Sequence, residues 1–497
     1  MKKYINIYLG ILLVTISSCS DDFVDIDERG AATATTVEDL RLTLDGINGA
    51  FVDNNDETLL HYTEMFFTDE ITHMSLASYN GIFAQPDRRA YGFEDFIYNE
   101  AEADLTWNRY YKVISSANFV LNQVDDLPDA LGQRDQVKGE ALVYRAFAYL
   151  WLVNIYADNY TDATAQNSMG VPIITEFGDP TVSLVRASVD DVYDLIINDL
   201  NEATVLLSGS TGSVFKPGAA ATYGLLAKAY LQMGKYDLAK ENADEALAIN
   251  NSILDYNTLP IAPVAINFDF VNLSLWSPRP GESENPETIF YFNNQYGLDF
   301  ASLQGGTFVS LDPNYFPVTS STSFVSDDVM ALGSPFDIRF SRMIFNTNGD
   351  NRFLGYGDFR VTRGIPKGIN TAELTLIKAE SEARTGDFNT AMAILNDFRS
   401  KRFFNFVPGA YILTATNPDE AIQHILDERQ REFMLRGYRM FDIKRLNAHH
   451  NTNISATHVI PTDGSSVTLE ANNPKWNAAI PPAEILLAPE LIQNPRN

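Results

Sequence analysis

Apolar residues recur at steps of three and four along most of the chain, which is the period of an amphipathic α-helix. The pattern predicts helical segments at residues 37–51, 58–69, 104–124, 133–156, 189–207, 217–250, 369–401 and 417–446. Segment 133–156 is apolar nearly all round, so we expect it to be deeply buried. Segment 189–207 follows Ser188, a residue type that caps helix N-termini. The pattern therefore predicts a mostly α protein.

The helical period stops between residues 254 and 363. This stretch is rich in Pro, Gly, Asn, Ser and aromatic residues, which favour turns and irregular backbone. We therefore expect a helical frame that is interrupted by one large, loop-rich insert. Binding residues concentrate on loops that a rigid frame holds in place, so the insert is a candidate for the functional part of the chain.

Two predicted helical hairpins share a pattern of small residues around a short turn. Each turn has a glycine followed two positions later by an aromatic residue: Gly234 and Tyr236 in the first, Gly386 and Phe388 in the second. Small residues let two helices pack closely, and this pattern is typical of tetratricopeptide (TPR) hairpins, which often contact another protein. The two copies are far apart, so they are not a simple tandem array. The TPR-type helices are expected mainly within residues 104–250 and 369–446.

The N-terminus has the parts of a secretory signal. Two lysines precede a mostly apolar run at 5–16, which is shorter than the roughly 20 residues that span a bilayer, and two serines stand directly before Cys19. Residues 13–19 resemble the bacterial lipobox. This resemblance implies that residues 1–18 are removed as a lipoprotein signal peptide and that Cys19, the only cysteine, carries acyl chains such as palmitate. The alternative is a secretory signal with a chance cysteine. The small, polar and acidic residues 19–38 are expected to form a tether.

Charge narrows the classes of ligand. The formal net charge is −29, and it becomes −31 once the leader, with its two lysines and no acid, is removed. So acidic a chain disfavours nucleic acid and other polyanions as ligands. The alternative is that the negative charge serves only to keep the protein soluble. Aromatic residues make up 12 % of the chain. Most must lie in the core, but a few in loops would suit stacking against the C–H face of a sugar.

Several motifs, in order along the chain, resemble the SusD/RagB family of surface glycan-binding lipoproteins of the Bacteroidota. They lie at residues 107–127, 138–160, 170–174, 186–203, 427–445 and 478–495. The segment DERQREFMLRGYRMFDIKR is similar to the family signature R-x-x-E-F-x-x-E-G-x-R-x-x-D-x-x-R, with Arg436 where the signature usually has Glu. The last segment is similar to the closing motif of the family, with Ala488 where that motif usually has Asn. The pattern E-A-x-x-x-R-A-x-x-Y-x-x-L is matched from Glu140 to Leu152.

The resemblance implies one SusD-like unit over residues 39–497 and a lipoprotein without catalytic activity. Such a protein captures an oligosaccharide or polysaccharide and delivers it to a SusC-like TonB-dependent transporter for nutrient uptake. Ser20, Asp21 and Asp22 resemble the signal that sends Bacteroidota lipoproteins to the outer leaflet of the outer membrane, which implies anchoring at the cell surface through Cys19. The alternative is a helical-repeat partner or lid subunit of such a transporter without glycan specificity of its own.

Two loop-rich stretches, residues 72–100 and the insert at 254–363, carry most of the residues that we expect to bind a sugar. The candidates are the aromatic residues Tyr79, Tyr91, Trp276, Tyr296, Phe300 and Tyr315, with Asp69 and Asn80 as hydrogen-bonding partners for hydroxyl groups. They lie outside the shared motifs and are inferred from their polar surroundings, so core packing is the alternative for each aromatic. Trp107 and Trp151, by contrast, fall on helical faces and are expected in the core. The acidity of the chain favours a neutral glycan.

Catalytic chemistry has little support in the sequence. The signature residues Arg429, Glu432, Arg436, Arg439 and Asp442 follow one another at three- and four-residue steps. We expect them on one helix as a structural network of ion pairs. No nucleophile or oxyanion loop accompanies them, so we expect neither an enzyme nor a cofactor.

Metal binding is likewise not expected. His449, His450 and His458 cluster in what the sequence predicts to be a polar loop, without the ligand spacing and geometry of a metal site, and we expect surface histidines there. Residues 345–353 are rich in side-chain oxygens but lack the twelve-residue spacing of a calcium loop, so an ordinary turn is expected.

Overall fold

The protein is mostly helical, as the apolar pattern predicts. The computed structural model describes residues 34–49, 67–70, 73–74, 79–80, 85–178, 183–210, 212–258, 285–292, 309–310, 337–339, 367–406, 408–433 and 437–496. The helices expected at 37–51, 104–124, 133–156 and 189–207 are confirmed to within a few residues at each end. Of the helix expected at 58–69, only residues 67–69 are described, and they belong to a turn.

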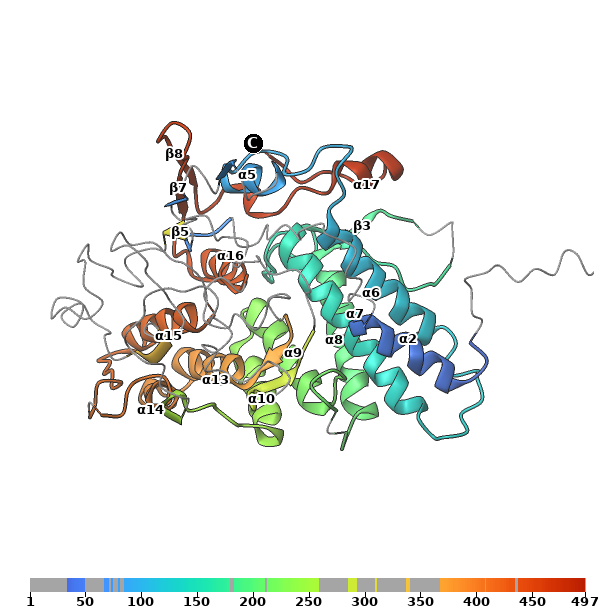
Figure 1. Cartoon of the computed structure of the whole chain (residues 1–497), viewed down its shortest axis with the longest axis horizontal. Coiled ribbons are helices and arrows are strands. Elements are labelled where there is room, and N and C mark those ends of the chain that lie inside the picture. Colours follow the sequence, from blue (N-terminus) through green and yellow to red (C-terminus); the bar gives the residue numbers. More distant parts are fainter. Residues whose placement is uncertain are drawn as a thin grey trace, which may run out of the picture.

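Four helices form the first group, seen on the right in Figure 1. They are α2 (Val37–Gly49), α6 (Leu105–Leu121), α7 (Arg134–Tyr156) and α8 (Val189–Leu206). Helix α7 packs against the other three, and every residue from Gly139 to Tyr156 is buried, which confirms the expected central position. Side-chain caps mark the N-termini of two of the others: the Asp104 carboxylate caps α6, and Ser188 and Asp191 form a reciprocal capping box at α8.

Two helical hairpins continue this group as one row of packed helices. The first hairpin is α9 (Ala219–Gln232) with α10 (Tyr236–Ile249), and the second is α13 (Thr371–Thr385) with α14 (Phe388–Ser400). Helix α8 packs on α9, and α10 packs directly on α13, so hairpins far apart in the sequence are neighbours in space (Figure 1). Gly234 turns the first hairpin with φ of +71°, a backbone conformation that glycine adopts without steric cost.

The C-terminal helices correct one expectation. A single helical stretch was predicted at 417–446, but α15 (Pro418–Glu432) ends and α16 (Tyr438–His450) begins after Gly437. Gly437 has φ of +79°, a left-handed conformation that interrupts the helical path. Helix α15 packs on α13 and α14, whereas α16 contacts α9 and is buried from Tyr438 to Leu446. Two short helices, α5 (Gln85–Tyr91) and α17 (Pro482–Leu487), lie at the upper edge in Figure 1.

Short strands join segments that are distant in the sequence. One sheet has the order β5 (Val309–Ser310), β1 (His73–Met74), β7 (Ala456–Val459) and β8 (Ser466–Leu469). Strand β1 is antiparallel to β5 and parallel to β7. Two further antiparallel pairs are β2 (Met169–Pro172) with β3 (Arg186–Ser188), and β4 (Thr288–Phe290) with β6 (Ile369–Asn370).

Of the expected insert at 254–363, the structure describes four segments. These parts are residues 254–258, 285–292, 309–310 and 337–339. Strand β4 pairs with β6 just before α13, and β5 pairs with β1. The amide of Tyr256 donates to the Lys401 carbonyl at 2.9 Å, and that of Ile338 donates to the Arg402 carbonyl at 2.8 Å. Backbone hydrogen bonds therefore hold all four segments: residues 309–310 pair with strand β1, and the other three bond to residues that adjoin α13 or α14.

Candidate functional site

The motif residues on α7 tie this helix to its neighbours. Arg145 donates hydrogen bonds of 2.7 and 2.8 Å to the two carboxylate oxygens of Asp199 on α8. Glu140 accepts a hydrogen bond of 2.9 Å from Arg41 on α2. The Tyr149 hydroxyl donates to the carbonyl of Ile174 at 3.0 Å and accepts from its amide at 2.8 Å. These residues therefore brace the frame.

The signature at 427–445 forms a buried network that spans the break between α15 and α16. Arg429 on α15 donates through Nε to both carboxylate oxygens of Asp442 on α16, at 2.8 and 3.1 Å. Arg445 joins the same Asp442, at 2.8 Å, to Glu380 on α13, at 2.7 and 2.8 Å. The ion pairs were expected, but on a single helix. The turn at Gly437 instead places them so that they link two helices to a third.

Electrostatics keep these carboxylates charged. Burial by itself raises the pKa of Glu380, but the guanidinium groups of Arg445 and Arg384 outweigh it and hold this pKa well below its usual range. Burial also works against the charged form of Asp442, and Arg429 and Arg445 again lower its pKa. Neither group carries a proton at neutral pH, so neither is suited to be a general acid there.

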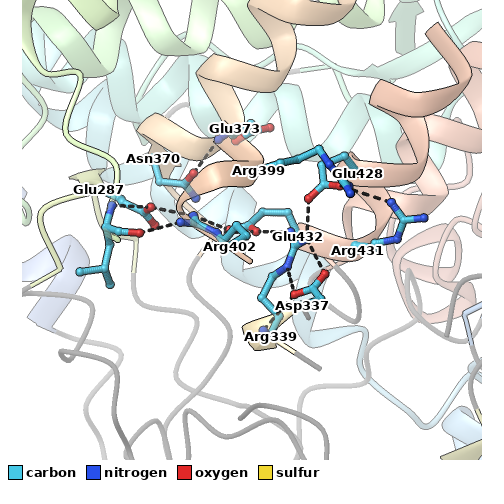
Figure 2. Close-up of polar contacts among 11 residues, drawn as sticks. Glu287, Asp337, Arg339, Asn370, Glu373, Arg399, Arg402, Glu428, Arg431 and Glu432 are labelled. Atoms are coloured by element: carbon cyan, nitrogen blue, oxygen red, sulfur yellow. Dashed lines mark hydrogen bonds and ion pairs between the residues drawn. The ribbon is translucent and has the colours of Figure 1, made fainter. Parts of the chain in front are cut away.

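A second buried network lies where the insert reaches α15 (Figure 2). Its members are four arginines and four acidic residues: Arg339, Arg399, Arg402, Arg431, Glu287, Asp337, Glu428 and Glu432. Arg339 of the insert donates to Asp337 at 2.7 Å and to Glu432 at 2.8 Å, and it also contacts Glu428. Arg402 joins Glu432, at 2.8 Å, to Glu287 beside β4, at 2.7 Å. The network therefore fastens two insert segments to one helix.

Opposite charges balance in this second network. Burial raises the pKa of Glu428, but Arg339, Arg399 and Arg431 together hold it well below its usual range. Burial lowers the pKa of Arg402, and Glu287 and Glu432 more than restore it. Buried charges are tolerated only when they are paired in this way. The arrangement is thus that of a structural anchor.

Asp69, an expected sugar contact, is engaged by the frame. Its two carboxylate oxygens accept hydrogen bonds of 2.8 and 2.6 Å from Arg439 on α16. Both side chains are largely buried, with 13 % exposure for Asp69 and 7 % for Arg439. This corrects the expectation of a free hydrogen-bonding partner, because both oxygens of Asp69 accept from the guanidinium group in a largely buried pair.

Tyr79 and Asn80 lie next to α5, whose last residue is Tyr91, and we call this region the corner around Tyr79. The three residues differ in exposure. Tyr91 is fully buried, and its hydroxyl donates to the Val459 carbonyl at 3.1 Å. This placement removes Tyr91 from the candidate sugar contacts, since neither ring face is open. Tyr79 is half-buried, its ring and that of Tyr91 meet edge to face at a centroid distance of 6.3 Å, and Asn80 beside it is exposed. Arg88 donates hydrogen bonds to the backbone carbonyls of Tyr79, at 2.9 Å, and Asn80, at 3.3 Å.

The histidines correct another expectation. His449 and His450 lie in the last turn of α16 and not in a loop, and the His449 Nε2 atom is 2.9 Å from the Gln232 carbonyl oxygen. His458 is in β7 and is fully buried, although a surface position was expected. Its ring stacks between Tyr91 and Phe93, with both centroid distances at 4.4 Å. Val459 and Ile460 beside His458 are apolar, but a strand of four residues is too short to show from its sequence which face is buried.

The remaining candidates fall outside the described residues. These are Trp276, Tyr296, Phe300 and Tyr315 in the insert and Cys19 in the N-terminal segment. Trp107 and Trp151 are buried, as expected. Among the described residues, no three His, Cys, Asp or Glu side chains are grouped so that they could hold a metal ion; residues 345–353 are not described. Within the same described ranges, no helix has the length and apolar character needed to cross a bilayer.

Sequence reasoning missed the residues of the insert that fasten it. Asp337 and Arg339 are about ninety positions away from Glu428 and Glu432, and no local pattern pairs them. The only available signal was the charge excess of α15, whose acidic residues need cations from elsewhere once they are buried. Helical spacing accounts for the pair of Arg445 and Asp442, three positions apart, but not for Arg429 with Asp442 or for these long-range partners.

The fold and the two networks define a class of protein. It has a row of packed helical hairpins, short strands that gather distant segments, and signature charges that anchor a long insert. Two family models match the chain: one described as "Starch-binding associating with outer membrane" matches residues 22–231, and the model of the SusD family matches residues 369–496. The chain belongs to the SusD/RagB family.

Relatives and solved structures agree with this assignment. A SusD-like protein of Formosa agariphila is 24 % identical over 90 % of this chain and 92 % of its own length. A SusD-like carbohydrate binding protein from Bacteroides vulgatus has a similar fold, with a TM-score of 0.66, 20 % identity, and coverage of 92 % of this chain and 98 % of that one. A SusD superfamily protein from Bacteroides thetaiotaomicron gives a TM-score of 0.65 at 20 % identity and covers 93 % of this chain and all of its own.

Proposed function

We propose that this protein is a non-catalytic glycan-binding lipoprotein of the cell surface that delivers its ligand to a SusC-like TonB-dependent transporter. Family membership supports the proposal, because one matching family model is described as starch-binding and as associating with the outer membrane. A solved structure of similar fold is, by its own name, a carbohydrate binding protein. The glycan-binding role is carried over from these descriptions.

The observation that favours binding over catalysis is that the charged side chains of the signature pair with other side chains of the fold. Arg429 and Asp442 pair with each other, and Glu428 and Glu432 are held by arginines. Side chains committed in this way are not available to activate a water or protonate a leaving group. The chemistry that remains is recognition, which aromatic platforms and hydrogen-bonding side chains can provide without a reacting group.

The proposed ligand surface combines the insert with the corner around Tyr79. Trp276, Tyr296, Phe300 and Tyr315 are proposed as stacking platforms in the insert. Tyr79 keeps part of its surface exposed and Asn80 is exposed beside it, so both can reach a ligand at the edge of the frame. A neutral glycan is favoured, because a polyanionic one would meet a strongly acidic protein.

The proposed attachment to the membrane is lipidation of Cys19 after removal of residues 1–18. The tether was expected at residues 19–38, but Ala34 and Val37 are buried in the core and α2 begins at Val37, so the tether would end before residue 34 and the single folded unit would begin there. More than one acyl chain is needed for stable anchoring, which agrees with the double acylation that the lipobox resemblance implies. The hairpins α9–α10 and α13–α14, with their TPR-type pattern, are proposed as the side that contacts the transporter.

Calorimetry and affinity electrophoresis against a panel of neutral and acidic polysaccharides test the proposal. We expect binding to at least one neutral glycan, without release of reducing ends on long incubation. Binding to none, together with stable co-purification with a transporter from native membranes, would favour the alternative of a partner or lid subunit without glycan specificity. Release of reducing ends by the purified protein would contradict the non-catalytic role.

A further inference from the structure

Both ring nitrogens of His458 face backbone carbonyl oxygens. The Nδ1 atom is 2.8 Å from the oxygen of Tyr91, and the Nε2 atom is 2.8 Å from the oxygen of Thr68. A carbonyl oxygen only accepts hydrogen bonds, and a neutral imidazole has a single N–H. Only the doubly protonated ring donates to both carbonyls. In the neutral ring, one nitrogen lone pair would point at a carbonyl oxygen.

The faces of the ring are also suited to a cation. Tyr91 stacks on one face and Phe93 on the other, at centroid distances of 4.4 Å and interplanar angles of 10° and 28°. A cation this close to an aromatic face is attracted by the negative charge density of the ring. Two charge-assisted hydrogen bonds and two aromatic faces thus offset the cost of burying the charge.

Titratable residues lie on the described elements that carry or adjoin the partners of His458. They are Asp69 and Glu70 in the turn before β1, Asp87, Arg88 and Arg89 on α5, Arg439 on α16, Asp463 in the turn between β7 and β8, and Lys475, which donates to the Phe93 carbonyl at 3.1 Å. Tyr79 and Glu94 flank α5, and His73 in β1 is paired in the sheet with Val459, the residue after His458. Asp69 is paired with Arg439, and Glu70, which follows it, is buried.

We propose that His458 is held as an imidazolium and positions the corner that carries Tyr79 and Asn80. Through its two hydrogen bonds it joins the turn at 67–70 and the end of α5 to the β7–β8 hairpin. Tyr79 packs against Tyr91, so its ring depends on the backbone that His458 holds. The imidazolium stands on geometry alone, whereas its importance for ligand binding rests on the proposed function.

The protonation state can be measured directly. In the mature protein labelled with ¹⁵N-histidine, long-range ¹H–¹⁵N spectra separate protonated from unprotonated ring nitrogens. At pH 7.5, about one unit above the ordinary histidine pKa of about 6.5, we expect both nitrogens of His458 to carry protons. His424, partly exposed on α15, is the internal reference. One protonated and one unprotonated nitrogen at His458 would overturn the proposal.

Hydrogen exchange tests the positioning role. In the wild type, we expect the protection of residues 67–70 and 91–93 to fall once the pH exceeds the titration of His458. In the His458→Gln variant we expect protection to be at least tenfold lower at pH 7 and to lack this transition, with His424→Gln as the matched control. Should His458→Gln not fold, the wild-type pH series still decides: protection that does not respond to the ring titration refutes the role.

Glycan affinity separates this proposal from the proposed function. Weaker binding by His458→Gln, with wild-type binding by His424→Gln, supports positioning of the ligand corner. Unchanged binding by His458→Gln would overturn that link. Failure of the wild type to bind any glycan would contradict the proposed function and leave the spectroscopic result on His458 as it stands.

Discussion

The ammonium nitrogen of Lys444 on α16 lies 2.6 Å from the carbonyl oxygen of Asn154, in the last turn of α7. It is equally close to the carbonyl oxygen of Ala157. The side chain is buried, and this burial lowers the pKa of Lys444 to about 7, although Asp158 acts in the opposite direction. A neutral amine still has two N–H groups, enough for both carbonyls. Lys444 therefore closes the C-terminal end of α7 in either protonation state.

This lysine predicts how stability depends on pH. Above pH 7, Lys444 is neutral in the folded protein and charged in the unfolded chain, whose lysine pKa is about 10.4. The unfolded chain then binds more protons, so this residue makes the folded state more stable as the pH rises. Relative to a Lys444→Met variant, the wild type should gain on the order of 1 kcal/mol per pH unit between pH 7 and 9.

Urea unfolding at three pH values measures this difference. Lys138→Met on α7 is the matched control, because Asp125 raises the pKa of Lys138 and keeps it charged in both states over this range. Parallel pH profiles for the wild type and the Lys444→Met variant would contradict the prediction.

The pair of Asp69 and Arg439 should contribute strongly to stability. The Asp69→Ala variant removes the carboxylate that accepts two hydrogen bonds from the largely buried Arg439, which should cost roughly 3 kcal/mol of unfolding free energy. Asp125→Ala, which removes an exposed partner of Lys138, should cost less than about 1 kcal/mol. Chemical denaturation followed by circular dichroism compares the two. Equal effects would mean that the Asp69 pair is no stronger than a surface pair.

The anchor of the insert predicts a contrast between two arginines on Glu428. Arg339→Ala leaves Asp337 and two buried glutamates short of a cation and should destabilise the protein by roughly 3–5 kcal/mol. Arg431 is 21 % exposed and lies 3.3 Å from the same Glu428. The Arg431→Ala variant should therefore lose about 1 kcal/mol of unfolding free energy or less. Limited proteolysis should cleave the insert faster in Arg339→Ala only. The reverse order of sensitivity would refute the anchor.

Trp276→Ala tests the proposed ligand surface. If Trp276 is an open platform, the variant should bind oligosaccharide roughly tenfold more weakly, with little change in melting temperature. A core tryptophan would instead cost about 3–5 kcal/mol of stability. Calorimetric titration and thermal melts on this variant, with Trp107→Ala as the reference for a buried tryptophan, distinguish the two. Unchanged affinity with a large fall in melting temperature would shift attention to Tyr79 and Tyr296.

Cys19→Ala tests the anchor. Without the thiol no acyl chain can be attached, so the variant should be absent from the outer-membrane fraction. Metabolic labelling with a palmitate analogue should mark the wild type and not the variant. A variant that still sediments firmly with the outer membrane would show that another contact holds the protein there.

The helical frame was largely predictable because its signals are local. Apolar period, the Ser188 cap and the glycine turn of the hairpin at Gly234 all act within a few residues, and the corresponding helices are confirmed. The break at Gly437 was missed because charges at three- and four-residue steps were interpreted as a helical period. A glycine within the signature was the available signal, since Gly437 is the N-cap of α16 and its left-handed backbone cannot be part of a continuous right-handed helix.

The candidate site was harder to predict because its contacts are long-range. Asp69 meets Arg439, and His458 meets Thr68, across nearly four hundred positions. Strands of two to four residues, such as β1 and β7, are too short to give a period-two signal. An aromatic residue in a polar stretch, such as Tyr91, can equally be exposed or buried, and only the tertiary structure decides between them.

The direct packing of α10 on α13 has a consequence for the diversification of the insert. The helix row is continuous across the point where the insert leaves and returns, so the frame does not rely on the length of the chain between them. Lengthening a loop is inexpensive in entropy, about 0.6 kcal/mol for each doubling. Insert loops of different size and sequence can therefore be exchanged on one unchanged frame, provided that β4 and the Asp337–Arg339 anchor are kept.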